Sequence, residues 1–200
     1  NLIDTCFKNR VRTFVNLGSS CIYPKKAKQP IKEDYLLSGK LEPSNEAYAL
    51  AKIVGLKSCE FYNRQFKTNY FTLMPCNLYG PNDNFNTKSS HFIPGLIKKF
   101  YLSNLKNLKR VEVWGSGRPK REIMHVDDLA SAVFFILSKI ESRDKKVLKV
   151  LKKNSHLNIG ASKEYTIKQY ANIIAKLFLK KIDLKFNKKY PDGIPRKLLN

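Results

Sequence analysis

The feature that most constrains the fold is an alternation of short, β-rich apolar runs with longer runs of helical periodicity. Short apolar runs that end in Gly, Pro or polar residues are typical of buried parallel strands, whereas apolar residues at helical spacing predict amphipathic helices. Strands that alternate with helices form a parallel sheet, so the chain is expected to be an α/β protein. We expect strands at 12–18, 70–76, 110–114, 157–160 and 182–186, and helices at 45–67, 90–103, 127–139 and 166–179.

The segments between these runs are expected to be less regular. Residues 1–10 have the pattern of the end of a helix, and 122–125 that of a short extended piece. Residues 25–43 and 77–89 are predicted to be loops, because Pro, Gly and Asn are frequent there. Residues 141–155 are predicted to be a charged connection without regular structure.

The charge of the chain raises the question of a nucleic-acid partner. The 200 residues include 38 Lys and Arg against 16 Asp and Glu, a formal net charge of +22. A strongly basic chain is a candidate nucleic-acid binder. Here most basic residues are lysines scattered along the sequence, with no Arg-rich stripe, zinc-ligand spacing or aromatic RNA-binding signature. We therefore expect no nucleic-acid partner, and note that a basic surface also suits a polyanionic small molecule such as a nucleotide.

Membrane and metal sites are not predicted either. No apolar run approaches the ~20 residues that a membrane-spanning helix needs, and no signal peptide is visible, so we expect a cytoplasmic protein without a membrane partner. The cysteines Cys6, Cys21, Cys59 and Cys76 lack metal-ligand spacing. We expect them to be free thiols and predict no metal centre.

A candidate proton donor lies in the run Glu46–Lys52, which has the pattern of a helix start with Ser44 and Asn45 as candidate N-caps. Tyr48 and Lys52 are four residues apart and so share one helix face. A phenol has a pKa of about 10, and a fixed ammonium nearby lowers that pKa toward neutrality, where proton transfer is efficient. By spacing alone the pair also fits a surface tyrosine beside a surface lysine.

Polar residues follow two of the predicted strands. Ser19 and Cys21 follow the first strand, and Asn77 follows the second. In parallel sheets, ligands bind outside the carboxyl ends of the strands. Ser19 and Cys21 are two residues apart, so in an extended run both side chains would point the same way. Since the helix bearing Tyr48 and Lys52 starts between these strands, a site is predicted at this edge.

Seven motifs occur in order along the chain: GSSCIYP at 18–24, SNEAYALAK at 44–52, MPCNLYGPNDNF at 74–85, SHFIP at 90–94, VWGSG at 113–117, REIMHVDD at 121–128 and PDGIPRKLL at 191–199. Together they resemble the extended short-chain dehydrogenase/reductase family, over nearly the whole chain and least clearly at 141–156. The resemblance implies part of a Rossmann-like doubly wound parallel sheet at 1–90 and 122–140. It also implies a small α/β substrate-binding domain at 91–121 and 156–200.

One motif of the family has no counterpart here. The Gly-rich strand–turn–helix that holds the cofactor pyrophosphate is missing, and the sequence contains no G-x-x-G-x-x-G. The final helices of the family's substrate domain are missing as well. We therefore expect the chain to be the middle and late part of a longer enzyme. By itself it is expected to bind the dinucleotide poorly and to be inactive.

The resemblance implies NADP(H) as cofactor and a reaction in two parts on a GDP-sugar. The first part is 3,5-epimerisation of GDP-4-keto-6-deoxy-D-mannose, and the second is its NADPH-dependent 4-reduction to GDP-L-fucose. For the reduction, Tyr48 would protonate the C4 oxygen, Lys52 would lower its pKa and hold the nicotinamide ribose, and Ser19 would polarise the ketone. For the epimerisation, Cys21 and His91 would form the acid/base pair, and which step each serves is open.

The resemblance also implies binding residues. The residues expected to hold the cofactor are Leu17, Gly18, Ser19, Ser20, Lys52, Pro75, Cys76, Asn77, Leu78 and His91. Positively charged lysine and arginine side chains suit the pyrophosphate of a GDP-sugar, and a tryptophan side chain offers a flat apolar face. From the residues alone, Trp114 also fits a plain strand core and Lys99 a solvated helix face, while His125 and His156 are taken as structural. The residues expected to hold the GDP-sugar are Lys99, Trp114, Arg121, Asp192 and Lys197.

Two other functions are considered. One is another nucleotide-sugar epimerase or dehydratase of the same family, which Cys21 and His91 disfavour because a simple 4-epimerase needs no second acid/base pair. The other is a non-catalytic fragment of the fold, which the missing Gly-rich loop favours. Relatives pair through the tyrosine-bearing helix and its neighbour, so the resemblance implies a homodimer.

Overall fold

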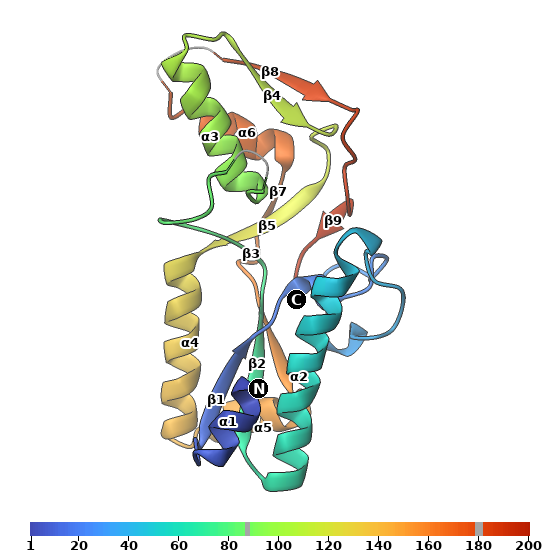
Figure 1. The fold of residues 1–200 in the computed structure, drawn as a ribbon, viewed down its shortest axis with the longest axis vertical. Coiled ribbons are helices and arrows are strands. Elements are labelled where there is room, and N and C mark those ends of the chain that lie inside the picture. Colours follow the sequence, from blue (N-terminus) through green and yellow to red (C-terminus); the bar gives the residue numbers. More distant parts are fainter. Residues whose placement is uncertain (87–88, 179–181) are drawn as a thin grey trace.

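The computed structural model describes residues 1–86, 89–178 and 182–200 (Figure 1). The end of the helix predicted at 166–179 falls outside these residues, as do positions 87 and 88 of the predicted 77–89 loop. The helices are α1 (Leu2–Lys8), α2 (Glu46–Phe66), α3 (Phe92–Leu105), α4 (Val126–Glu141), α5 (Lys145–Lys153) and α6 (Ile167–Ala175). The strands are β1 (Thr13–Leu17), β2 (Asn69–Pro75), β3 (Asn77–Tyr79), β4 (Arg110–Trp114), β5 (Lys120–His125), β6 (His156–Ile159), β7 (Glu164–Thr166), β8 (Asp183–Asn187) and β9 (Arg196–Lys197).

A parallel sheet of order β1-β2-β6 forms the lower part of the molecule in Figure 1. Its central strand β2 is buried at every residue after the first, as its continuous apolar sequence predicts. On one face, Leu56 of α2 packs with Met74 in one core cluster. On the other face, Ile136 of α4 packs on Phe71 and Leu73. The predicted α/β class with a parallel sheet is confirmed, because one strand is covered by helices on both faces.

The upper part of Figure 1 contains smaller sheets. β4 and β8 form a parallel pair, and β5 pairs with β3, β7 and β9. In β4, Val111 and Val113 point into a core shared with Phe100 of α3 and Tyr170 of α6, while the alternate residues stay exposed. This alternation is what one buried face predicts for a strand. It directs Trp114, the last residue of β4, outward.

The prediction that 141–155 lacks regular structure is wrong, because α5 occupies Lys145–Lys153. Asp144 caps this helix by accepting hydrogen bonds from the backbone N–H groups of Lys146 at 2.9 Å and Val147 at 3.1 Å. Leu151 packs against the cluster of Phe71 and Leu73. The density of lysines conceals the helical apolar period in this segment, and tertiary packing stabilises a helix that is short for its own nucleation.

Two further segments differ from expectation. Asn77–Tyr79, predicted to begin a loop, forms β3 by pairing with β5. His156–Ile159, grouped with the substrate-binding region in the predicted domain division, pairs in parallel with β2 in the first sheet. The chain thus returns to the first sheet before it enters β7. The domain boundaries themselves stay a prediction. No helix within the described ranges is both long and apolar enough to cross a bilayer.

Candidate active site

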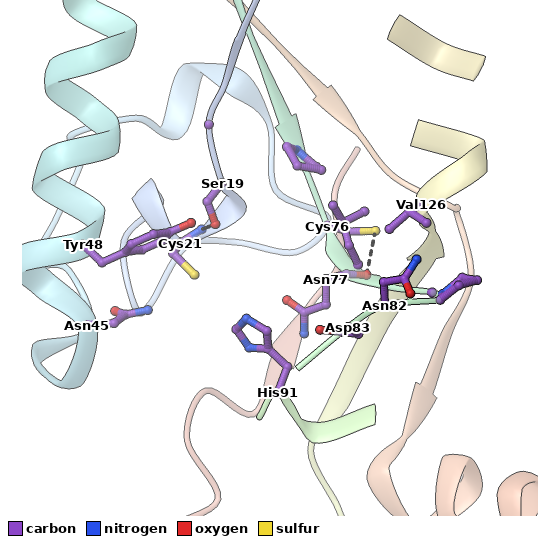
Figure 2. A pocket seen from close by; sticks show the side chains of 15 residues that line it. Ser19, Cys21, Asn45, Tyr48, Cys76, Asn77, Asn82, Asp83, His91 and Val126 are labelled. Atoms are coloured by element: carbon purple, nitrogen blue, oxygen red, sulfur yellow. Dashed lines mark hydrogen bonds between the residues drawn. The ribbon is translucent and has the colours of Figure 1, made fainter. Parts of the chain in front are cut away.

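A cavity of about 580 Å³ opens at the carboxyl edge of β1 and β2 (Figure 2). It lies where the predicted edge site was expected. Its lining comes from the segment after β1, the start of α2, the end of β2 and the segment that follows it, the residue before α3 and the first residue of α4. We refer to it as the active-site cavity. Its lining residues are Gly18, Ser19, Cys21, Asn45, Tyr48, Pro75, Cys76, Asn77, Leu78, Gly80, Pro81, Asn82, Asp83, His91 and Val126.

Ser19 and Cys21 enter the cavity from the end of β1. The expected extended run is wrong here, because Ser20–Ile22 forms a 3₁₀ turn that begins directly after Ser19. The Ser19 hydroxyl caps this turn by accepting a hydrogen bond of 3.2 Å from the backbone N–H of Cys21. Both side chains still line the cavity. The 3₁₀ turn, and not the alternation of side chains along a strand, therefore brings the Ser19 hydroxyl and the Cys21 thiol together.

Tyr48 reaches the cavity from the first turn of α2. Figure 2 shows its ring extending from the helix toward Ser19 and Cys21. One turn further along, the Lys52 ammonium lies 5.6 Å from the centroid of the Tyr48 ring. The same ammonium donates a hydrogen bond of 2.8 Å to the carbonyl of Leu17. The carbonyl at the end of β1 thus holds the Lys52 ammonium in place beside the Tyr48 ring. A tyrosine and a lysine that were merely solvated neighbours on the surface would lack such an anchor.

The electrostatics around Cys21 distinguish it from the buried cysteines. The ammonium of Lys197 donates a hydrogen bond of 3.2 Å to the Cys21 sulfur. Burial raises the pKa of the Cys21 thiol, but the charge of Lys197 and hydrogen bonds with Ser19, Lys197 and Asn45 outweigh it, so that pKa lies below its usual value. Burial raises the pKa of Cys59 to about 11 and that of Cys76 to about 12. Among these three thiols, Cys21 is the one prepared to act as a thiolate.

His91 approaches the cavity from the opposite side to Tyr48 (Figure 2). It is the residue before α3, with extended backbone, and its side chain forms no capping bond to the helix. The imidazole is therefore available to the cavity. Cys21 and His91 supply a thiol and an imidazole, two groups able to transfer protons, on different walls of one space.

The residues predicted to hold a cofactor fall into three groups. Most line the cavity: Gly18, Ser19, Pro75, Cys76, Asn77, Leu78 and His91. Leu17 and Lys52 are joined to each other by their hydrogen bond. Ser20 is buried and does not line the cavity. A Cβ on Gly18 would lie 2.3 Å from the sulfur of Met74, so only glycine lets β1 leave the sheet this close to β2.

Sequence reasoning missed three polar residues of the cavity. Asn45 was interpreted as a helix cap, yet it makes no capping bond and its Oδ1 is buried without a partner in the described part of the chain. Asn82 and Asp83 were interpreted only as loop residues. The available signal was position, because Asn45 directly precedes the tyrosine-bearing helix and the other two follow β3.

A second group of predicted residues gathers at the end of β4. The Lys99 ammonium lies 4.1 Å from the centroid of the Trp114 ring and donates a hydrogen bond of 3.1 Å to the carbonyl of Glu112. Tyr190, which was not predicted, stacks on Trp114 with 4.4 Å between ring centroids and 14° between ring planes. Trp114 is 45% exposed, so it is not a plain core residue. We refer to Lys99, Trp114 and Tyr190 as the Trp114 patch.

Asp192 and Arg121 are two further residues predicted to hold the GDP-sugar, and their charges interact. Asp192 accepts hydrogen bonds from the backbone N–H of Ser116 at 2.6 Å and from its hydroxyl at 2.7 Å. Gly115, with φ +81°, makes room for the carboxylate, since a Cβ there would lie 2.5 Å from Asp192 Oδ1. Burial lowers the pKa of Arg121, and the charges of Asp192 and Cys21 act in the opposite direction. Lys197, also predicted to bind the GDP-sugar, lies at Cys21 and apart from Lys99 and Trp114 in its contacts.

Neither cavity nor patch resembles a metal centre. No cluster of three His, Cys, Asp or Glu residues suited to a metal ion occurs at 1–86, 89–178 or 182–200. The chemistry of the donors present is that of proton transfer and anion binding.

Among curated relatives, GDP-L-fucose synthase of Escherichia coli (strain K12) is 46% identical over 200 residues, which is 100% of this chain and 62% of that protein. GDP-L-colitose synthase of Yersinia pseudotuberculosis is 39% identical over 201 residues, again 100% of this chain and 62% of that protein. The chain thus spans about three fifths of the length of these relatives.

Solved structures of GDP-sugar enzymes also superpose on this chain. A GDP-6-OMe-4-keto-L-xylo-heptose reductase from C. jejuni superposes with a TM-score of 0.88 at 33% identity, over 100% of this chain and 65% of that one. A GDP-L-fucose synthetase from Naegleria fowleri bound to NADP gives 0.87 at 26% identity, over 100% and 61%. Residues 1–160 match the model of the NAD dependent epimerase/dehydratase family. The resemblance read from the motifs is confirmed: this chain is a homologue of GDP-L-fucose synthase and belongs to the NAD dependent epimerase/dehydratase family.

Proposed function

We propose that the chain carries the reaction site of an NADPH-dependent enzyme that converts GDP-4-keto-6-deoxy-D-mannose to GDP-L-fucose by 3,5-epimerisation and 4-reduction. The observation that supports this most is the Cys21 thiol, which is hydrogen-bonded by Lys197 in the same cavity as Tyr48, Ser19 and His91. A reductase alone needs only the tyrosine, lysine and serine. The thiol and the imidazole are the additional groups that epimerisation requires.

For the reduction, the Tyr48 hydroxyl is the proton donor to the C4 oxygen. It lies in the cavity beside the Ser19 hydroxyl, which can donate a hydrogen bond to the ketone and so polarise it. Lys52 stabilises the phenolate that forms, because its ammonium is held near the ring by the carbonyl of Leu17. NADPH, when bound, supplies the hydride to C4.

The residues present fit a nicotinamide cofactor at this edge. Gly18 gives close access to the end of β1, and Lys52 keeps donors free for ribose hydroxyls after its one bond to Leu17. Asn77 and Leu78 line the same cavity and would lie against the nicotinamide half. That a related synthetase was solved with NADP bound supports the choice of NADP(H).

For the epimerisation, the carbons next to the ketone must lose a proton and regain it on the opposite face. Cys21 is placed to remove the proton as a thiolate, because Lys197 stabilises its negative charge. His91, on the other wall, is placed to return a proton from the opposite face. Two proton-exchanging groups on different walls are what inversion at carbon requires.

The nucleotide end of the substrate is proposed to lie over the Trp114 patch. Trp114 offers an exposed flat face, and Lys99 and Arg121 offer positive charge for the pyrophosphate. Asp192 fixes the loop at Ser116, and Lys197 would contact the sugar from its place beside Cys21. The names of the related enzymes, which act on GDP-sugars, support a GDP-sugar here.

A GDP-sugar 4-reductase without epimerase activity is the second candidate, and the similarity to the heptose reductase favours it. The deciding experiment uses the full-length protein that carries this chain, incubated with the 4-keto-6-deoxy GDP-sugar in D₂O without NADPH. Deuterium at C3 and C5 is the expected result. Its absence would remove the epimerase proposal and leave the reductase.

Tyr48→Phe in the same protein separates the two half-reactions. We expect NADPH oxidation to fall by about 10²–10⁴-fold, because the proton donor is lost, while deuterium exchange at C3 and C5 continues. Tyr101→Phe is the matched control, since Tyr101 has the same 49% exposure on α3. Normal NADPH oxidation by Tyr48→Phe would refute the proton-donor role of Tyr48.

We also propose a homodimer through the outer face of α2. Leu50, Val54 and Phe61 lie on that helix and are all exposed, Val54 at 64%. A second copy would cover these apolar side chains. Sedimentation is expected to give twice the 23.1 kDa chain mass, and Val54→Glu is expected to give one chain mass. A monomer in the unsubstituted chain would contradict the proposal.

A further inference from the structure

Trp114 already has a stacking partner within the chain. The phenol ring of Tyr190 lies parallel to the indole at 4.4 Å and 14°, which is the geometry that a bound nucleobase would adopt. The Lys99 ammonium also lies over the indole, 4.1 Å from its centroid. A stacked ring occupies one whole face of the indole. The flat surface that suits a nucleotide is therefore partly taken before any ligand arrives.

Tyr190 is the more weakly attached of the two groups on Trp114. Its side chain is 41% exposed, and in the described part of the chain its hydroxyl forms no hydrogen bond. Lys99 is rooted on α3 and its ammonium also donates to the Glu112 carbonyl. Burial lowers the pKa of Lys99, as expected for an amine partly withdrawn from water. A ligand that needs the face of Trp114 would therefore displace Tyr190 and leave Lys99 in place.

The backbone beneath Tyr190 is anchored. Two residues later, Asp192 holds the loop through both hydrogen bonds with Ser116. The Tyr190 backbone N–H contacts the Asn187 carbonyl at 3.3 Å, directly after β8. With both sides fixed, removal of the ring from Trp114 needs only rotation of the Tyr190 side chain, which is a fast and local motion.

We propose that Tyr190 is an internal substitute for the nucleobase: it stacks on Trp114 in the free chain and is exchanged for the purine of the incoming nucleotide diphosphate. This rests on the proposed function, because it deepens the assignment of the Trp114 patch to the GDP end of the substrate. A purine has a larger ring surface than a phenol, and its diphosphate brings charge to Lys99. The larger ring therefore favours purine nucleotides over ligands with smaller rings. Their affinity is lower than it would be without Tyr190, because binding must first break the Tyr190–Trp114 stack.

The test uses GDP and the fluorescence of Trp114, which is the single tryptophan of the chain. Tyr190→Ala is expected to bind GDP roughly three- to tenfold more tightly, because no internal ring competes for the indole. Tyr190→Phe keeps the stack and is expected to stay within about twofold of the original affinity. Tyr101→Ala, an exposed tyrosine on α3, is the matched control and is expected to leave the affinity unchanged.

Weaker GDP binding by Tyr190→Ala would overturn the proposal, since Tyr190 would then hold the base instead of preceding it. Equal GDP affinity of the original chain and of Tyr190→Ala would also overturn the proposal. ADP and UDP separate this inference from the proposed function. If ADP binds and is tightened by Tyr190→Ala while GDP does not bind, the exchange stands and the GDP-sugar assignment falls. If only UDP binds and is tightened, the purine exchange is overturned. If no nucleotide binds to either protein, the exchange is overturned.

Discussion

The active-site cavity and the Trp114 patch are built differently. In the cavity, chemical groups are held by other groups: Ser19 caps the turn of Cys21, Lys197 bonds the thiol, and Leu17 holds Lys52. In the patch, rings and a cation lie on an exposed surface, and contact between faces replaces most hydrogen bonds. Proton transfer depends on pKa values that only fixed, partly buried neighbours can shift. Recognition of a flat base needs a flat surface that remains accessible.

The segment between Asp192 and Lys197 connects the two regions. Asp192 anchors to Ser116 beside the patch, whereas Lys197, five residues later, reaches Cys21 in the cavity. The pairing of β9 with β5 directs the chain from one region to the other. One short segment thus serves both regions, and each end can be altered separately.

The largest expected effect concerns thiol reactivity. At pH 7.5, iodoacetamide is expected to alkylate Cys21 at least about 100-fold faster than Cys59 or Cys76, because each pKa unit changes the thiolate fraction about tenfold. The pKa of Cys21 is lowered, while burial raises those of Cys59 and Cys76 to about 11 and about 12. The thiolate forms as the pH rises through the pKa, so Cys21 becomes reactive at the lowest pH of the three. Peptide mapping by mass spectrometry measures this, and equal rates would show that the cavity does not activate its thiol.

A smaller effect decides to which region Lys197 belongs. Lys197→Met removes the cation beside Cys21, so the pKa of Cys21 should rise and its alkylation at pH 7.5 should slow by about tenfold. GDP affinity should stay within about twofold. Lys189→Met, which removes an exposed lysine three residues before Asp192, is the control. Reduced GDP affinity with unchanged alkylation would instead place Lys197 functionally in the patch.

The smallest effect is expected at Asp192. The two carboxylate oxygens of Asp192 accept the hydrogen bonds from Ser116. Asp192→Asn removes the negative charge and one of these acceptors, so the loop under Tyr190 should loosen. The melting temperature should fall by a few degrees and GDP affinity by severalfold, while Cys21 alkylation stays the same. Asp183→Asn in β8 is the control, because it removes an exposed acid from the same half of the molecule. A change in Cys21 alkylation would show that the regions are coupled.

Much of the fold and of the cavity could be predicted from local patterns. The apolar run of β2 and the helical period of α2 are local, and the edge rule places Ser19, Cys21 and Tyr48 in one cavity. Where local patterns failed, contacts between distant parts of the chain decided the outcome. α5 forms because Leu151 packs on β2, and β3 forms because it pairs with β5.

The sequence alone determined the main alternation of strands and helices, the i, i+4 pairing of Tyr48 with Lys52, and the motifs that identify the family. Periodicity and spacing are properties of neighbouring residues, so they survive without a structure. Only the tertiary structure decided that Lys197 meets Cys21 across 176 positions and that Tyr190 covers Trp114. Those contacts depend on which strands pair, and strand pairing is a property of the whole chain rather than of any segment in it.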